Sequence, residues 1–268
     1  RAYVGGTSGL IYGYVNDGFY KVEDFEYFDS KSRTWKLKEG VVDSSPLSDT
    51  PRPGNAKFKK LTPVDPNSSN PYQLTEADRT VIGNTTPKFS GGFGLNATYK
   101  GFDLSMFFNF MYDFDVFNAN KVMLTTWADN HENNFGMEVA SDKRWRNFDD
   151  MGNEIRYSPE LLAEFNKNAT MWNPTSIGKP ISMSYAVEDG SFLRLNSATL
   201  GYTLPQEWTK KAGLNKVRFY VAGSNLFTIT GYSGYDPEVD IATGLTPNID
   251  NNRYPRSRTY TFGAQLTF

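Results

Sequence analysis

The chain has 268 residues, and its 28 basic and 30 acidic side chains nearly balance. It therefore lacks the basic surplus that is typical of a nucleic-acid-binding protein. It contains no cysteine, which excludes disulfides and thiolate metal sites. No run of roughly 20 apolar residues marks a transmembrane helix. Aromatic residues make up 15% of the chain, a share that suits β-strands and aromatic girdles at a membrane surface.

Taken in chain order, seven segments have the residue pattern of β-strands. They are Gly9–Val15, Gly18–Phe28, Lys88–Tyr99, Phe102–Asp113, Ser191–Thr203, Lys216–Thr230 and Ser257–Phe268.

Apolar residues alternate with polar or small residues most strictly in the closing segment. This pattern places one face of a strand in an apolar medium and the other in water. The segment keeps the pattern up to its last, aromatic residue, and its apolar face carries Tyr260, Phe262, Ala264, Leu266 and Phe268. Rows of about 10 residues are what a tilted barrel strand needs to cross a bilayer.

The connections between these segments alternate between short and long. The short ones are Asn16–Gly18, Lys100–Gly101 and Pro205–Asn215, and the long ones cover about 29–87, 114–190 and 231–256. If the carboxyl terminus is periplasmic, every long connection falls outside the cell and every short one in the periplasm. Outer-membrane barrels have this asymmetry.

Three stretches within the connections are compatible with helices. Gln206–Ala212 is expected to form one or two helical turns that end at Gly213. Asn133–Asn147 and Pro159–Asn168 lie in the longest connection, and Ser158-Pro159-Glu160 has the cap, first position and acidic first turn of a helix start.

These observations predict an all-β fold, a transmembrane antiparallel barrel with long extracellular loops. Seven strands do not close such a barrel, because the smallest have eight and bacterial ones are even-numbered. The chain is therefore expected to be the carboxyl-terminal part of a larger barrel, with Arg1 a cleavage point or the start of a segment. The rival interpretation is a secreted β-sandwich that binds carbohydrate, although such a fold would have turns every 8–12 residues.

Eight stretches, in the right order, resemble the SusC/RagA-type TonB-dependent transporters of Bacteroidetes outer membranes. They are Tyr12–Phe19, Asp78–Asn84 with Pro87–Phe89, Tyr99–Ser105, Val187–Leu195, Thr199–Pro205, Ser224–Thr228, Tyr232–Glu238 and Tyr254–Tyr260.

The resemblance implies a 22-stranded barrel with a plug in its lumen, of which residues 1–268 would form the last seven or so strands. It also implies a SusD-like surface lipoprotein that acts as a lid over the barrel. Transport would be driven by the TonB–ExbB–ExbD complex, which would act through an amino-terminal part absent from this chain. Family members often carry an acidic run before the Asp78–Gly83 stretch, but this chain reads Thr62–Ser69 there without one. An ion site of family members at that place is therefore not assigned to this chain.

Residues for bond-making chemistry are sparse, so no catalytic residue is assigned and the protein is expected not to be an enzyme. His131 is the single histidine, and a nucleophilic site needs a base that a third group orients. It is interpreted as a solvated loop residue. Gly91–Gly94 is glycine-rich, but it lies within an alternating strand, where small inward residues let a plug or a neighbouring strand approach closely.

Two residue sets are candidates for binding. Aromatic side chains stack on sugar rings and anchor peptides, and the longest connection carries Trp127, Trp145, Trp172 and Tyr185. The alternative for each is packing within the loop. Asp236, Glu238 and Asp240, with Asp250, offer oxygen ligands to calcium, although their spacing matches no EF-hand; no other cofactor is expected.

The sequence as a whole predicts an outer-membrane importer of large nutrients. By family association the cargo is expected to be a glycan, with oligopeptide as the alternative. The expected partners are the SusD-like lipoprotein, the TonB complex and outer-membrane lipid, and not nucleic acid.

Overall fold

The computed structural model describes all residues except 1–7, 127–134, 137–138, 140–142, 178–180 and 240–247. The described chain forms two compact units. Unit 1 consists mainly of Leu10–Gly83 and Phe117–Val187, and unit 2 of Asn84–Val116 and Glu188–Phe268. In the ranges that are described, no helix has both the length and the apolar character needed to cross a membrane.

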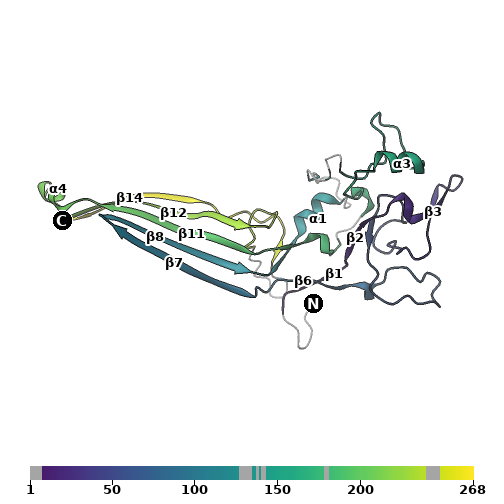
Figure 1. Ribbon diagram of the computed structural model, residues 1–268, viewed down its shortest axis with the longest axis horizontal. Coiled ribbons are helices and arrows are strands. Elements are labelled where there is room, and N and C mark those ends of the chain that lie inside the picture. The colour runs from purple at the N-terminus through teal and green to yellow at the C-terminus, as the bar shows by residue number, and fades with distance from the viewer. Residues whose placement is uncertain (1–7, 127–134, 137–138, 140–142, 178–180, 240–247) are drawn as a thin grey trace. The chain divides into compact units, whose positions relative to one another are not determined.

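Unit 2 is built on a five-stranded antiparallel sheet of order β14-β12-β11-β8-β7. Figure 1 shows these long strands side by side, with β14 and β7 at the two edges. Five of the seven predicted segments thus form one sheet. Its strands are β7 (Phe89–Tyr99), β8 (Phe102–Tyr112), β11 (Phe192–Thr203), β12 (Lys216–Thr230) and β14 (Thr259–Thr267).

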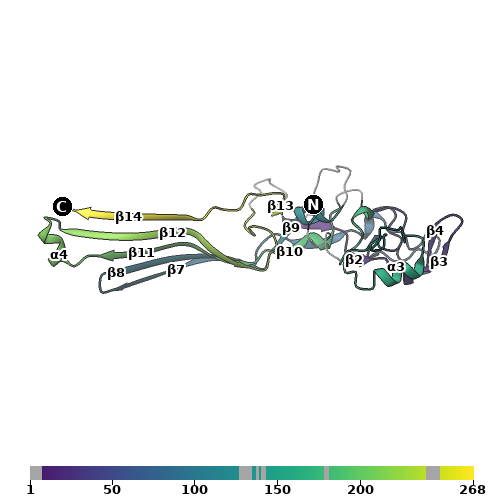
Figure 2. The same cartoon turned by 90° about the horizontal axis from the view of Figure 1, so that it is seen from above.

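Two of the three predicted short connections have the predicted local structure. Lys100 and Gly101 join β7 to β8 with φ of 45° and 87°, the two positive values of a tight type I′ hairpin turn. Between β11 and β12 lies α4 (Gln206–Lys211), followed by Gly213 at φ 72°. Figure 2 shows α4 beside the last residues of β14. In an antiparallel sheet, both short connections lie at one end and the long ones at the other.

A bulge interrupts β11 and shifts its register with both neighbours between Leu195 and Ser197. On the facing strand β12, Asn225 has φ 53°, a conformation that asparagine tolerates better than most residues. The bulge inserts one residue into each ladder. On β11 the apolar face therefore passes from odd positions such as Leu195 to even positions such as Leu200, so that it continues along the strand.

Unit 1 consists of short elements around two apolar clusters. The larger cluster includes Phe58, Leu74, Trp172, Ile177 and Met183, all buried. The smaller cluster consists of Trp145, Ile155 and Leu162. Three strand pairs, β1–β6, β2–β5 and β3–β4, belong to this unit. The strands are β1 (Leu10–Gly13), β2 (Asn16–Phe19), β3 (Phe25–Asp29), β4 (Thr34–Leu37), β5 (Ala56–Phe58) and β6 (Thr80–Asn84).

The remaining elements are small. A three-stranded sheet has the order β10-β9-β13. Its strands and the described helices are β9 (Asp115–Asn118), β10 (Val187–Asp189), β13 (Ile249–Asp250), α1 (Ala119–Thr125), α3 (Pro159–Phe165) and the 3-10 helices η1 (Val22–Asp24), η2 (Glu76–Asp78), η3 (Pro174–Ser176) and η4 (Ser184–Ala186).

The first two predicted strands are wrong as continuous barrel strands. Gly9–Val15 contributes only β1, and Gly18–Phe28 is broken into the end of β2, the helix η1 and the start of β3. The predicted tight turn Asn16–Gly18 is part of β2, which pairs with β5. The reason lies in Tyr20 and Phe25, which are both buried although their odd spacing would place them on opposite faces of one strand.

Of the two helices predicted in the longest connection, one is confirmed and the other is not. Helix α3 begins after Ser158, whose hydroxyl accepts a hydrogen bond from Leu161 N, with Pro159 at the first position, as predicted. Of Asn133–Asn147, much lies outside the described residues. Its last part is not helical, because Arg144 bridges Met171 as a short parallel strand contact.

Candidate functional site

One face of the unit 2 sheet is apolar across its whole width. The register places Phe93 opposite Phe108, Phe108 opposite Leu195, and Leu195 opposite Phe227. Further along, Val221 lies opposite Phe262, which is 80% exposed. An exposed apolar surface of this extent marks an interaction or membrane surface. Its exposed members include Phe89, Phe93, Leu95, Tyr99, Phe102, Tyr112, Leu200, Phe219, Phe227, Ile229, Tyr260, Phe262 and Leu266.

The opposite face of the same sheet is polar. It carries Ser90, Asn96, Thr98, Ser105, Asn109, Thr199, Thr228, Thr261 and Gln265, the residues that alternate with the apolar row. Arg218 on β12 donates from Nε to Asp103 Oδ1 on β8 over 2.9 Å, crossing the intervening strand at Gly201. A Cβ on Gly201 would lie 2.4 Å from Arg218 Nη2, so glycine lets this side chain lie flat on the sheet.

The glycine-rich stretch Gly91–Gly94 makes room for a side chain of the neighbouring strand. A Cβ on Gly92 would lie 2.7 Å from the ring of Phe107, which belongs to the polar face of β8. The expected close approach is thus made by an aromatic ring. The other expectation, close approach of a plug to this stretch, stays a prediction.

At the long-connection end, the segment after β12 is held on the polar face by buried contacts. Tyr232 and Val239 pack with Phe114, Val116 and Phe192 in one cluster. Arg194, only 2% exposed, pairs through Nη2 with Asp236 and lies 3.7 Å from Glu238 Oε2.

The acidic calcium candidates are therefore engaged by basic side chains. Besides Arg194, Arg256 contacts Glu238 at 2.9 Å. Asp250 accepts a hydrogen bond from the Tyr232 hydroxyl over 2.7 Å, and Asp240 lies outside the described residues. Within the described part of the chain, no cluster of three or more His, Cys, Asp or Glu residues could hold a metal ion. Calcium binding stays a prediction.

The structure places Trp145 and Trp172 in different apolar clusters and brings Tyr185 against Trp172. Trp145 is 4% exposed and packs with Ile155 and Leu162, whereas Trp172 is 2% exposed and lies in the larger cluster. Tyr185 contacts Trp172 edge-on with ring centroids 4.6 Å apart. Trp127, like His131, lies outside the described residues. Two of the four are thus buried packing residues in this structure, and their contact with cargo stays a prediction.

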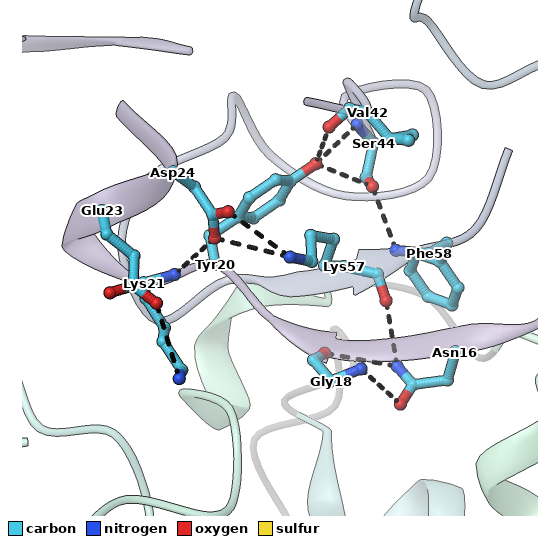
Figure 3. A network of polar contacts seen from close by, with 10 residues as sticks. All are labelled: Asn16, Gly18, Tyr20, Lys21, Glu23, Asp24, Val42, Ser44, Lys57 and Phe58. Atoms are coloured by element: carbon cyan, nitrogen blue, oxygen red, sulfur yellow. Dashed lines mark hydrogen bonds and ion pairs between the residues drawn. The ribbon is translucent and has the colours of Figure 1, made fainter. Parts of the chain in front are cut away.

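A polar network that the sequence did not suggest surrounds Tyr20 of unit 1, which is buried. Figure 3 shows the Tyr20 hydroxyl directed at Val42 and Ser44. It donates to Val42 O over 2.5 Å and accepts from Ser44 N over 3.0 Å. Lys57 Nζ lies 3.5 Å from Asp24. Burial, only partly offset by the hydrogen bonds with Ser44, raises the pKa of Tyr20 to about 12.

A second network surrounds Asp78, whose side chain is fully buried. One oxygen accepts from Leu61 N over 2.9 Å and Thr62 N over 2.7 Å, and the other accepts from Thr75 N over 2.8 Å. Lys60 Nζ lies 3.5 Å away. The capping pattern Thr75-x-x-Asp78 was the signal that could have revealed this residue.

Comparison with known proteins decides the family. TonB-dependent receptor P3 of Formosa agariphila is 32% identical over 270 residues, which cover 98% of this chain and 22% of the receptor. This chain belongs to the SusC/RagA family of TonB-dependent receptors. TonB-dependent receptor P26 of the same organism is 28% identical over 88% of this chain, and SusC of Bacteroides thetaiotaomicron is 37% identical over 31% of it.

Solved structures with a similar fold are also found. The RagAB peptide transporter superposes with a TM-score of 0.65 at 22% identity, over 98% of this chain and 23% of that chain. A second structure, the RagAB peptide importer in its closed-closed state, gives a TM-score of 0.60. The chain thus spans less than a quarter of the relatives that it matches over most of its length. No family model matches it.

Proposed function

We propose that this chain forms the carboxyl-terminal strands and outer loops of an outer-membrane TonB-dependent importer. In this proposal the five-stranded sheet is part of the wall of a 22-stranded barrel, with its apolar face toward lipid and its polar face toward the lumen. A plug in the preceding part of the protein would occupy the lumen. The TonB–ExbB–ExbD complex would act on that plug from the periplasm.

The observation that carries the proposal is the division of one antiparallel sheet into an apolar and a polar face. Bacterial outer-membrane barrels have this polarity, with short periplasmic turns and long external loops. Lys100–Gly101 and the α4 connection would then be periplasmic. Unit 1, which arises mostly from the long connections, would be external.

The proposed cargo is a large nutrient, with a glycan favoured by the family association and an oligopeptide as the alternative. A SusD-like surface lipoprotein would cover the barrel and help to capture cargo. Binding and gated release require no bond-making step, so the protein would act as a transporter and not as an enzyme.

Mass spectrometry of the native complex tests this function. Outer membranes are extracted with detergent, and the proteins that co-purify with this chain are identified and weighed intact. The proposal predicts peptides from an upstream plug and barrel, together with a lipid-anchored partner. A lone species of about the mass of this chain, 30.2 kDa, that stays soluble without detergent would overturn it.

A further inference from the structure

A groove of about 520 Å³ lies on the surface of unit 1, and its walls are rich in arginine. Arg144, Arg146 and Arg156 line it together with Phe148, Asn147 and Asn173. Two aspartates, Asp149 and Asp150, complete the charged part of the wall. Neither the Tyr20 network nor the Asp78 network includes any of these residues.

The wall from Arg144 to Phe148 is fixed by hydrogen bonds to its backbone. Trp145 N donates to Met171 O over 2.8 Å. The Asn166 side chain accepts from Arg146 N over 2.6 Å and donates to Arg146 O over 2.9 Å. Arg144, Arg146 and Phe148 all line the groove, as does the buried Trp145 between them. The binding groups are thus held in place before any ligand arrives.

The acidic residues of the groove are already engaged, whereas several donors are not. Asp150 accepts from Arg146 Nη1 over 2.7 Å, and Asp149 accepts from Asn153 N and Nδ2 over 2.8 Å each. Arg144 has no ion pair within the described residues. The buried N–H groups of Arg156 Nε and Trp145 Nε1 have no hydrogen-bond acceptor there either, although Glu154 lies 3.4 Å from Arg156 Nε. A buried donor without an acceptor is costly.

We propose that this groove binds a carboxylate- or sulfate-bearing sugar residue of the cargo, an inference that rests on the proposed function. Guanidinium groups recognise such planar or multidentate anions through paired hydrogen bonds. The ring of Phe148, 48% exposed, offers a face to the C–H side of a sugar. The side-chain amide of Asn147 can hydrogen-bond to its hydroxyls, and so can Nδ2 of Asn173, whose Oδ1 already accepts from Thr175.

The same wall argues against an acidic peptide as the ligand. An extended peptide gains affinity by adding as a strand to a free edge. Here Trp145 N, both backbone groups of Arg146, and Asn147 O, which accepts from Ile155 N over 2.9 Å, are already hydrogen-bonded. The backbone of this wall is therefore not free to pair with a peptide strand, and a ligand in the groove is bound by side chains.

Calorimetric titration of the purified full-length transporter tests the inference. The probes are tetragalacturonate, its fully methyl-esterified form and a sulfated galactan tetrasaccharide. At least one acidic probe should bind about tenfold or more tightly than the neutral ester. The double variant R144Q/R156Q should weaken that binding at least tenfold, since charged hydrogen bonds are lost. Its hydrogen exchange at Trp145 N should be unchanged.

The matched control is K36Q/K38Q, which removes two exposed charges from unit 1 outside this groove and should change the affinity less than twofold. Three results would overturn the inference: no binding of either acidic probe, equal binding of the ester, or full competition by a tetraglutamate peptide. In any of these three cases, the proposed function still holds if mass spectrometry finds this chain in a complex with the plug and the lipoprotein. Absence of the chain from such a complex instead overturns the function.

Discussion

Single buried polar residues organise unit 1, and Asp78 is the clearest of them. Burial raises the pKa of Asp78, but the hydrogen bonds from Thr62, Thr75 and Leu61 outweigh it and hold that pKa well below the usual range of an aspartate. The carboxylate thereby ties the turn at Leu61–Thr62 to the start of η2. Losing it leaves several buried N–H groups without an acceptor.

The substitution Asp78→Asn should destabilise this turn by about 1–3 kcal/mol. Amide exchange at Leu61 and Thr62 should then speed up roughly 10- to 100-fold. Because the folded pKa is lowered, the stabilisation is present above the unfolded value of about 4 and is lost as the pH falls through the folded value. The exposed control Asp65→Asn should exchange like the wild type. Unchanged exchange in Asp78→Asn would contradict the account.

Tyr20→Phe should weaken the Val42–Ser44 loop by about 1–3 kcal/mol, because Val42 O and Ser44 N lose their buried partner. With the folded pKa raised to about 12, the stabilisation by the wild-type hydroxyl is complete below the unfolded value of about 10. It is lost as the pH rises through 12. The rate at which a protease cuts this loop, measured as the pH is raised, reports both the effect of the substitution and the loss of the wild-type stabilisation at high pH. Tyr254→Phe, at a 91% exposed position, serves as the control.

At the residue level, the sequence identified side chains with suitable chemistry but not whether each of them binds cargo or packs in a core. Trp145 and Trp172 were candidates because aromatic rings bind sugars, yet both are buried in the structure. Sequence alone does not reveal whether an aromatic loop residue faces a core, because loops lack the periodicity that assigns faces. Arg144 and Arg156 were missed for the same reason, since their groove joins residues about 30 positions apart.

Among the elements, the segment that follows β12 depends on one buried arginine. Arg194 faces two carboxylates, Asp236 and Glu238, whose side chains are 12% and 20% exposed. Removing one partner of a buried ion pair leaves the remaining charges uncompensated, at a cost of about 3–5 kcal/mol.

Arg194→Gln should therefore loosen residues 232–239 and expose them to protease, whereas Arg258→Gln, at an exposed position, should not. Adding Asp236→Asn to Arg194→Gln should restore part of the protection, because one uncompensated charge is removed. Protease cleavage mapped by mass spectrometry measures this. Equal cleavage in all of these variants would argue against the ion pair as the anchor.

The long strands were predictable because alternation, length and turn residues agree in them. Lys100–Gly101 and the α4 connection also followed from local rules. The first two predicted strands failed because unit 1 folds through contacts distant in sequence, such as Tyr14 N with Ser182 O over 2.9 Å. Such contacts override the pattern of a short apolar run.

For the whole molecule, the proposed transporter requires that the apolar face of the sheet lies against lipid and the polar face against water. Spin labels can be placed singly in this chain, since it contains no cysteine. A scan of β8 in reconstituted membranes compares the access of oxygen, which concentrates in lipid, with that of a water-soluble nickel chelate.

If the apolar face lies against lipid, oxygen access should peak at Leu104, Met106, Phe108 and Phe110, and chelate access should peak at Ser105 and Asn109. The two profiles should alternate with a period of two residues and in opposite phase. Equal chelate access at both sets of positions would contradict a lipid-facing sheet, and with it the proposed transporter.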